Sequence, residues 1–255
     1  MNRQQLLKQW KAEEDIAYIH GWDFSHLDGR MTEDTDFGWD YKDIVLQNLS
    51  PDKKMLDMDT GGGEFLLTLG HPYNNTSATE GYAPNVNLCR ETLLPLGIDF
   101  KEASDYSSLP FADEQFDIVI NRHGSFDAKE INRILKKGGL FITQQVGDRN
   151  DRELVELLMP GTPPSFSGLN LADQTRNFEN SGFRIVKGME AFRPMRFFDV
   201  GALVWFARII QWEFPGFSVD RYSDNLFNAY NLIKEKGSAD CTTHRYLIVA
   251  EKLQD

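Results

Sequence analysis

Cysteine is scarce in this chain, and its two residues form no disulfide or metal-binding pattern. Cys89 and Cys241 are the only cysteines among 255 residues, and they lie far apart with no C-x-x-C pair. This spacing indicates neither a disulfide framework nor a zinc site, and no other group of His, Cys, Asp and Glu has ligand spacing. We therefore expect two reduced thiols in a cytoplasmic protein without a dedicated metal.

Long apolar segments are also missing. The first ten residues, MNRQQLLKQW, contain no apolar stretch of the kind found in signal peptides. The most apolar stretch, residues 203–210, is interrupted by Arg208 and is too short to span a bilayer. No membrane association is expected.

Basic clusters are equally absent. The formal net charge is -12, the isoelectric point is about 4.9, and no Lys/Arg run is longer than Lys136–Lys137. An acidic chain has no general attraction for a nucleic-acid backbone, so the charge argues against a nucleic-acid partner. A hydrophobic content of 41% supplies the core of a soluble globular protein without disulfide or metal supports.

From residue 54 onward, short apolar runs alternate with helical segments. Strands are predicted at residues 55–58, 76–80, 99–103, 116–121, 140–146, 183–190 and 244–252. Helices are predicted at residues 3–19, 41–49, 64–69, 85–96, 129–135, 151–158 and 172–181. This alternation is typical of βαβ units and predicts an α/β fold with a doubly wound, mostly parallel, seven-stranded sheet.

The stretch MLDMDTGGGEFL, residues 55–66, places three glycines between the first of these strands and a helix. Glycine permits positive φ and lets a ligand approach the backbone closely. A Walker A loop would need Gly-Lys-Ser/Thr, which is absent. A dinucleotide loop would need a third spaced glycine where Leu66 stands, and Glu64 would repel a pyrophosphate.

The same loop resembles the first motif of class I S-adenosylmethionine-dependent methyltransferases, whose usual form is LDxGxGxG. Asp57, Gly61 and Gly63 match this motif, whereas Asp59 stands where the family's first glycine normally lies. Three further stretches resemble family motifs in the same order: SATEG at residues 77–81, SDYSSLPFADEQFDIVI at 104–120 and INRILKKGGLFI at 131–142. The resemblance covers about residues 50–146 and implies a Rossmann-like fold.

The resemblance also implies roles in binding S-adenosylmethionine. Glu80, just before Gly81, would accept hydrogen bonds from the ribose hydroxyls. Asp105 would meet the adenine amino group, and the Tyr106 backbone would reach a ring nitrogen. The remaining cofactor-binding positions implied by the motifs are Asp57, Asp59, Thr60, Gly61, Gly63, Gly81 and Asn121.

Each of these positions also has a simpler structural explanation. The glycines could form a mere turn, and Glu80 could be a solvated acid. Asp105 could cap a turn before Leu109–Pro110. Asp59 is an informative departure, since aspartate tolerates the left-handed backbone region and its carboxylate could bind the cofactor's ammonium group.

Residues that would meet the methyl acceptor are expected after the fourth strand, in INRHGSF. Asn121 would line the methionine part of the cofactor, with Arg122 on the substrate side. His123 is the best candidate general base in the chain, because histidine titrates near neutral pH. A loop histidine bonded to backbone is the alternative.

The segments outside the repeating pattern suggest a cover over the site. Residues 1–50 are predicted as an N-terminal helical segment covering the cleft, and 51–255 as the methyltransferase domain. Residues 191–243 would be an aromatic-rich inserted lid before the last strand, in which Trp205 could contact an aromatic or anionic substrate. The alternative is that these aromatics pack the added helix against the protein.

The sequence therefore predicts an enzyme that methylates a small-molecule acceptor by in-line transfer from S-adenosylmethionine. A catalytically inactive S-adenosylmethionine-binding protein is one alternative, with Asp59 as its main support. Methylation of RNA or protein is another alternative. The acidic net charge of the chain argues against RNA as the substrate. An NAD-dependent oxidoreductase ranks last.

Overall fold

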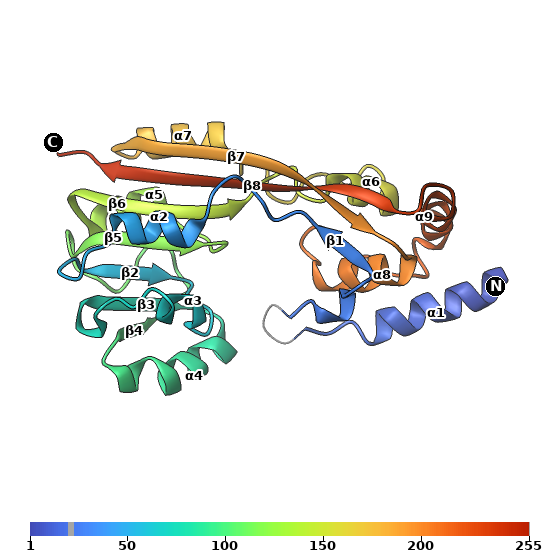
Figure 1. Cartoon of the computed structure of the whole chain (residues 1–255), viewed down its shortest axis with the longest axis horizontal. Coiled ribbons are helices and arrows are strands. Elements are labelled where there is room, and N and C mark those ends of the chain that lie inside the picture. The colour runs from blue at the N-terminus through green and yellow to red at the C-terminus, as the bar shows by residue number, and fades with distance from the viewer. Residues whose placement is uncertain (20–22, 255) are drawn as a thin grey trace. The chain divides into compact units, whose positions relative to one another are not determined.

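A computed structural model describes residues 1–19 and 23–254 (Figure 1). Residues 20–22, which belong to the N-terminal segment predicted to cover the cleft, lie outside the described residues, as does residue 255. The α-helices are α1 (Arg3–Asp15), α2 (Tyr41–Asn48), α3 (Glu64–Leu67), α4 (Ala83–Thr92), α5 (Ala128–Ile134), α6 (Arg152–Leu158), α7 (Leu171–Asn180), α8 (Val200–Ile209) and α9 (Ser223–Lys236). Short 3₁₀ turns are η1 (Ser25–Leu27), η2 (Tyr73–Asn75) and η3 (Leu94–Leu96).

The strands form an eight-stranded sheet in the order β1-β7-β8-β6-β5-β2-β3-β4. They are β1 (Met31–Glu33), β2 (Met55–Met58), β3 (Thr76–Glu80), β4 (Asp99–Glu102), β5 (Phe116–Arg122), β6 (Leu135–Val146), β7 (Phe183–Phe197) and β8 (Ala239–Lys252). The chain divides into two compact units. Unit 1 comprises residues 1–37, 148–167 and 192–244, and unit 2 comprises residues 38–147, 168–191 and 245–255.

Unit 2 contains the parallel part of the sheet. β4, β3, β2, β5 and β6 are parallel neighbours, and β8 pairs antiparallel with β6. β2 lies between β3 and β5, so the strand order reverses at β2. Ligands of open α/β sheets bind beyond the carboxyl ends of the strands at such a reversal. The predicted doubly wound, mostly parallel fold is confirmed.

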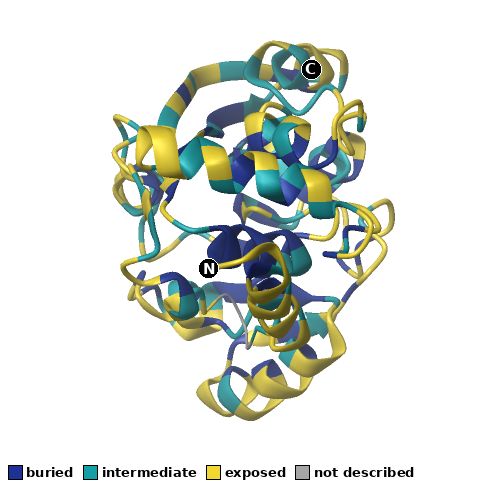
Figure 2. Cartoon of the chain, turned by 90° about the vertical axis from the view of Figure 1, so that its right-hand side faces the viewer, coloured by how far each residue is buried: buried dark blue, intermediate teal, exposed yellow. Residues whose placement is uncertain are grey.

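Helices cover both faces of this sheet, which explains why its strands are apolar on both sides. On one face, α2, α3 and α4 pack against alternate strand residues such as Met55, Ile118 and Ile142. On the other, α5 and α7 pack against the residues between them, such as Leu56 and Val119. Figure 2 shows helices on which buried and exposed residues alternate, as expected of amphipathic helices on a core.

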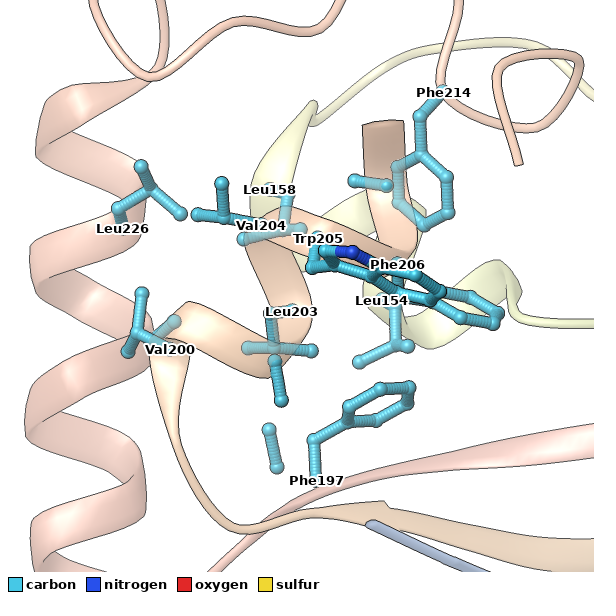
Figure 3. Packing of buried hydrophobic residues seen from close by; sticks show 14 of the residues in the cluster. Leu154, Leu158, Phe197, Val200, Leu203, Val204, Trp205, Phe206, Phe214 and Leu226 are labelled. Atoms are coloured by element: carbon cyan, nitrogen blue, oxygen red, sulfur yellow. The ribbon is translucent and has the colours of Figure 1, made fainter. Parts of the chain in front are cut away.

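Unit 1 has its own apolar core, built mainly around α8. Trp205, Phe206 and Phe214 lie in this core with leucines and valines from α6, α8 and α9 (Figure 3). α8 is buried almost all round because seven of its buried residues are apolar and the eighth is Gly201. A helix with this composition requires packing on every side. Unit 1 also has a cavity of about 600 Å³ between α1, α8 and α9.

Three strands, β6, β7 and β8, are each at least five residues longer than the sequence predicts, and the unpredicted β1 raises the predicted seven strands to eight. β1 pairs antiparallel with residues 195–197, which extends β7 beyond residue 190. β8 begins at Ala239 instead of residue 244. β6 begins at Leu135, because Leu135 pairs with Phe116 ahead of a β-bulge. Backbone pairing between distant segments leaves little periodic signal, so these boundaries were wrong in the prediction.

Candidate active site

The candidate site is built at the carboxyl ends of β2, β3 and β5. Asp57 lies in β2 opposite Ile120 of β5, and Met58 lies opposite Asn121. Glu80 ends β3. Because these strands are parallel neighbours, their ends bring the glycine loop, Glu80 and the residues after β5 to one edge of the sheet.

Glu80 ties the glycine loop to the end of β3. One carboxylate oxygen, Oε2, accepts a hydrogen bond from the Gly61 amide at 2.8 Å. The other, Oε1, accepts from the Gly81 amide at 2.9 Å and from the Tyr82 amide at 2.8 Å. A carboxylate has about four acceptor positions, so Glu80 retains capacity for a further donor such as a ribose hydroxyl. The side chain is buried, which fixes its orientation.

The loop itself requires glycine at two positions. Gly61 and Gly63 have φ of 65° and 86°, a left-handed conformation that most side chains avoid. A Cβ built on Gly61 would meet no atom within 4 Å, so its backbone faces open space. The Cys89 thiol donates a hydrogen bond to the Gly61 carbonyl at 3.1 Å, which anchors the loop to α4. The loop therefore exposes backbone to a ligand while remaining anchored.

Asp57 is buried at the start of the loop. Thr60 donates its hydroxyl proton to Asp57 Oδ2 at 2.7 Å. Burial raises the pKa of Asp57 to about 7, and the negative charges of Asp59 and Glu80 add to this effect, while Thr60 and Arg122 oppose it. A bound cation would favour the ionised carboxylate.

Asp59 adopts the left-handed region expected of it, with φ of 53°. Tyr106 donates its hydroxyl proton to Asp59 Oδ1 at 3.0 Å. Burial raises the pKa of Asp59 to about 6, and the charge of Glu80 contributes. The side chain lies against Gly124, since a Cβ built on Gly124 would be 2.4 Å from Asp59 Oδ2. Gly124 therefore makes room for the carboxylate that replaces the usual glycine.

Asp105 and Tyr106 lie in the loop that joins β4 to β5. The Asp105 carboxylate is exposed and accepts hydrogen bonds from the Ser107 amide at 2.9 Å and the Ser107 hydroxyl at 2.6 Å. These bonds lower the pKa of Asp105 and cap the turn. The simpler structural role is thus present, and contact of Asp105 with adenine stays a prediction.

Asn121 fastens the ends of three strands to one another. Its Nδ2 donates to the Met58 carbonyl at 3.2 Å, and its Oδ1 accepts from Gln145 Nε2 at 2.6 Å. The side chain is completely buried. Asn121 therefore supports the loop after β2 from within the protein, and its contact with the methionine part of the cofactor stays a prediction.

Arg122 and His123 follow at the exposed end of β5. The Arg122 guanidinium lies over the Phe65 ring, 4.6 Å from its centroid. His123 has a left-handed backbone, with φ of 63°, and its ring Nε2 lies 3.4 Å from Gln144 Nε2. The His123 side chain is exposed, and partial desolvation of the ring lowers its pKa, as do the charges of Arg245 and Arg122.

Comparison with known proteins relates the central part of the chain to a family. Residues 56–143 match the methyltransferase-domain family. In fold, the chain is similar to a crystal structure of a protein from Bacillus halodurans C-125 described as a methyltransferase, with a TM-score of 0.56 and 17% identity over 84% of this chain and 99% of that one. The match places the glycine loop, Glu80 and Asn121 inside the shared domain. Residues 56–143 therefore form a domain of the methyltransferase-domain family, and the chain has the fold of the Bacillus halodurans structure.

Relatives within the methyltransferase group differ in their acceptors. A fatty-acid O-methyltransferase of Mycolicibacterium smegmatis is 29% identical over 51% of this chain and 46% of its own length. A protein of Bacillus subtilis assigned as a 23S rRNA (guanine-N(1)-)-methyltransferase is 26% identical over 78% of this chain and 66% of its own length. The chain thus spans about half of the first relative and two thirds of the second.

Three residues that support the candidate site were not among the predicted cofactor-binding or catalytic residues. Gly124, Gln145 and Tyr41 support Asp59 and Asn121 without being part of a motif. The Tyr41 hydroxyl lies 3.2 Å from both the Asn121 and Ile142 carbonyls. The available signal was position, since Gly124 lies just after β5, which carries Asn121, and Gln145 lies near the end of the neighbouring strand β6.

Trp205 lies in a different compact unit from the candidate site residues. Trp205 belongs to unit 1, where it is 2% exposed and its ring lies tilted against the His26 ring, with ring centroids 5.0 Å apart. Its role in substrate binding, like the covering role of residues 1–50 and 191–243, stays a prediction. Among residues 1–19 and 23–254, no group of His, Cys, Asp and Glu could hold a metal ion. No helix in these described segments is long and apolar enough to cross a membrane.

Proposed function

We propose that this chain binds S-adenosylmethionine at the ends of β2, β3 and β5 and methylates a small molecule. The observation that carries the proposal is the bond from the Gly61 amide to the Glu80 carboxylate. This bond joins the glycine loop to the carboxylate with which methyltransferases of this family bind the ribose hydroxyls. Both groups lie where the strand order of the sheet reverses. Neither residue alone would distinguish this site from an ordinary turn.

The residues present fit this cofactor. Glu80 keeps acceptor capacity for a ribose hydroxyl, and Gly61 leaves its backbone open. Asp57 and Asp59 place two further carboxyl groups in the loop, which suits a ligand with sulfonium and ammonium charges. When bound, S-adenosylmethionine supplies a methyl group to a nucleophile. The protein's own task is to orient the acceptor and exclude water from it.

A small-molecule acceptor is supported by two observations. One relative is named a fatty-acid O-methyltransferase. In addition, the net charge of -12 disfavours a polyanionic substrate. The relative assigned to 23S rRNA covers more of this chain, so RNA methylation is the second candidate.

The two candidates can be separated with one labelled cofactor. Purified protein is incubated with S-adenosylmethionine carrying a radioactive methyl group and with either the small-molecule or the total RNA fraction of a cell extract. We expect label in the small-molecule fraction and none in RNA. Label in RNA alone would replace the proposal with the second candidate. Cofactor binding without transfer to either fraction would favour an inactive binding protein.

A further inference from the structure

The side chains around His123 restrict where its proton can be. The Trp39 indole nitrogen is a donor only, and it donates to Gln144 Oε1 at 2.8 Å. This bond orients the amide, so the Gln144 amino group must face the other way. That group lies 3.4 Å from His123 Nε2. Because an amide amino group only donates, His123 Nε2 must accept and therefore carries no proton.

The ring proton of neutral His123 is therefore on Nδ1. In this form His123 presents an N–H donor at Nδ1, while its acceptor nitrogen is already engaged by Gln144. A general base needs a free acceptor within reach of the proton that it removes. The pair Trp39–Gln144 thus equips His123 to donate a hydrogen bond, and it opposes protonation at Nε2.

Positive charge surrounds this donor. Arg122 precedes His123 and is exposed, and both Arg122 and Arg245 act electrostatically on the imidazole. Arg245 lies in β8 opposite Val146, next to the end of β6. The end of β5 therefore offers the exposed guanidinium of Arg122 and the neutral N–H donor of His123, within a chain whose net charge is strongly negative. Such a set recognises an anionic oxygen group.

We propose that the methyl acceptor carries a carboxylate, which is bound by His123 Nδ1–H and the Arg122 guanidinium. This inference rests on the proposed function. In the transfer, a carboxylate oxygen forms a bond to the methyl carbon while the carbon–sulfur bond breaks, and its electron pair remains on sulfur. The product is a methyl ester, and no proton moves. A carboxylate is ionised at neutral pH, so this reaction needs no general base.

The position of the imidazole proton can be measured without any activity. Two-dimensional ¹H–¹⁵N spectra of the histidine rings should show His123 with a protonated Nδ1 and an unprotonated Nε2, assigned by loss of the signals in His123→Asn. In Gln144→Glu, the second carboxylate oxygen would face Nε2, so the proton should move to Nε2. A protonated Nε2 in the wild-type protein would overturn the proposed donor role.

The chemical class of the acceptor can be tested on the labelled products. Mild alkali hydrolyses a methyl ester and releases volatile methanol, whereas N-, S- and ether-linked methyl groups are stable. We expect most of the label transferred to the small-molecule fraction to become volatile. Transferred label that is stable to alkali would overturn the carboxylate proposal and leave the proposed function intact. Absence of cofactor binding would instead remove both.

Variants then connect the residues to the acceptor. Using the alkali-labile product as readout, Arg122→Gln should raise the KM for the acceptor about tenfold or more, since a charge-assisted hydrogen bond is lost. Arg122→Lys should recover part of this loss. Arg176→Gln, which removes an exposed α7 arginine paired with Asp173, is the matched control. An unchanged KM in Arg122→Gln would contradict a role of Arg122 in acceptor binding.

Discussion

Residues 57–63, at the end of β2 and in its loop, and residues 122–124, at the end of β5 and in its loop, leave neighbouring strands of the same sheet, yet they carry opposite charge. The first contains Asp57 and Asp59 and is bonded to Glu80. The second contains Arg122 and His123. The acidic loop suits a cationic cofactor and the basic loop suits an anionic acceptor. This difference indicates that two adjacent sites at one edge of an α/β sheet can select different ligands by charge as well as by shape.

The largest expected effect is on the acidic side. In Glu80→Ala, the amides of Gly61, Gly81 and Tyr82 lose their acceptor, and the ribose acid is gone. S-adenosylmethionine affinity should fall about a hundredfold or more, as expected for the loss of several charge-assisted hydrogen bonds. Isothermal titration calorimetry would measure it.

The matched control is Glu102→Ala. Glu102 ends the neighbouring strand β4 but forms an exposed ion pair with Arg90, 2.6 Å away. This variant should bind the cofactor as the wild type does, because such surface pairs contribute little. Equal affinities of Glu80→Ala and wild type would show that the acidic loop is not the cofactor site.

The next effect concerns the contact that links the two loops. In Gly124→Ala, the new Cβ would lie 2.4 Å from Asp59 Oδ2 and 2.7 Å from Asn121 Nδ2. We expect a loss of about 1–3 kcal/mol in the free energy of unfolding, measured with urea. In the double variant, Asp59→Gly should relieve the part of this loss that comes from the Asp59 side chain, while the close contact with Asn121 remains. Additive effects of the two substitutions would mean that the carboxylate and Gly124 do not compete for the same space.

Asp57 should make stability depend on pH. Its pKa is about 7 in the folded protein and near 3.9 in an unfolded chain. Between these values the folded state binds more protons, so the free energy of unfolding should fall as pH rises from about 4 to 7. The slope for one such group reaches about 1.4 kcal/mol per pH unit.

Urea unfolding at pH 5 and pH 7 would measure this slope. Asp57→Asn should flatten it relative to the wild type, because asparagine can still accept the Thr60 hydroxyl proton but does not titrate. Equal slopes for the two proteins would show that ionisation of Asp57 does not change the free energy of unfolding.

The smallest expected effect separates the two explanations for Asp105. If its carboxylate binds adenine, Asp105→Ala should weaken cofactor binding about tenfold, the usual effect of one hydrogen bond to a charged group. Ser107→Ala is the control, since it removes the hydroxyl bond of the turn while leaving the carboxylate. Equal, small losses in both variants would leave Asp105 as a turn cap only.

The extent to which the sequence predicted the structure differs between the two units. β2 and β3 have the predicted bounds, because their apolar runs end at a glycine loop and at Glu80–Gly81. Asp59 has the predicted left-handed backbone. The role of Gly124 depends on which atoms lie above it in space, which no local pattern records. In unit 1, the pairing of β1 with β7 joins segments about 160 residues apart, so neither period nor motif marks it.

The central claim is that the acidic loop after β2 binds S-adenosylmethionine. Isothermal titration of S-adenosylmethionine into the purified full chain at pH 6 and pH 8 tests it most directly, with each pH repeated in two buffers of different ionisation enthalpy. We predict one site per chain, with tighter binding at pH 8 and protons released on binding at pH 6, since Asp59 and Asp57 ionise beside the bound cation. No binding at either pH would contradict the claim.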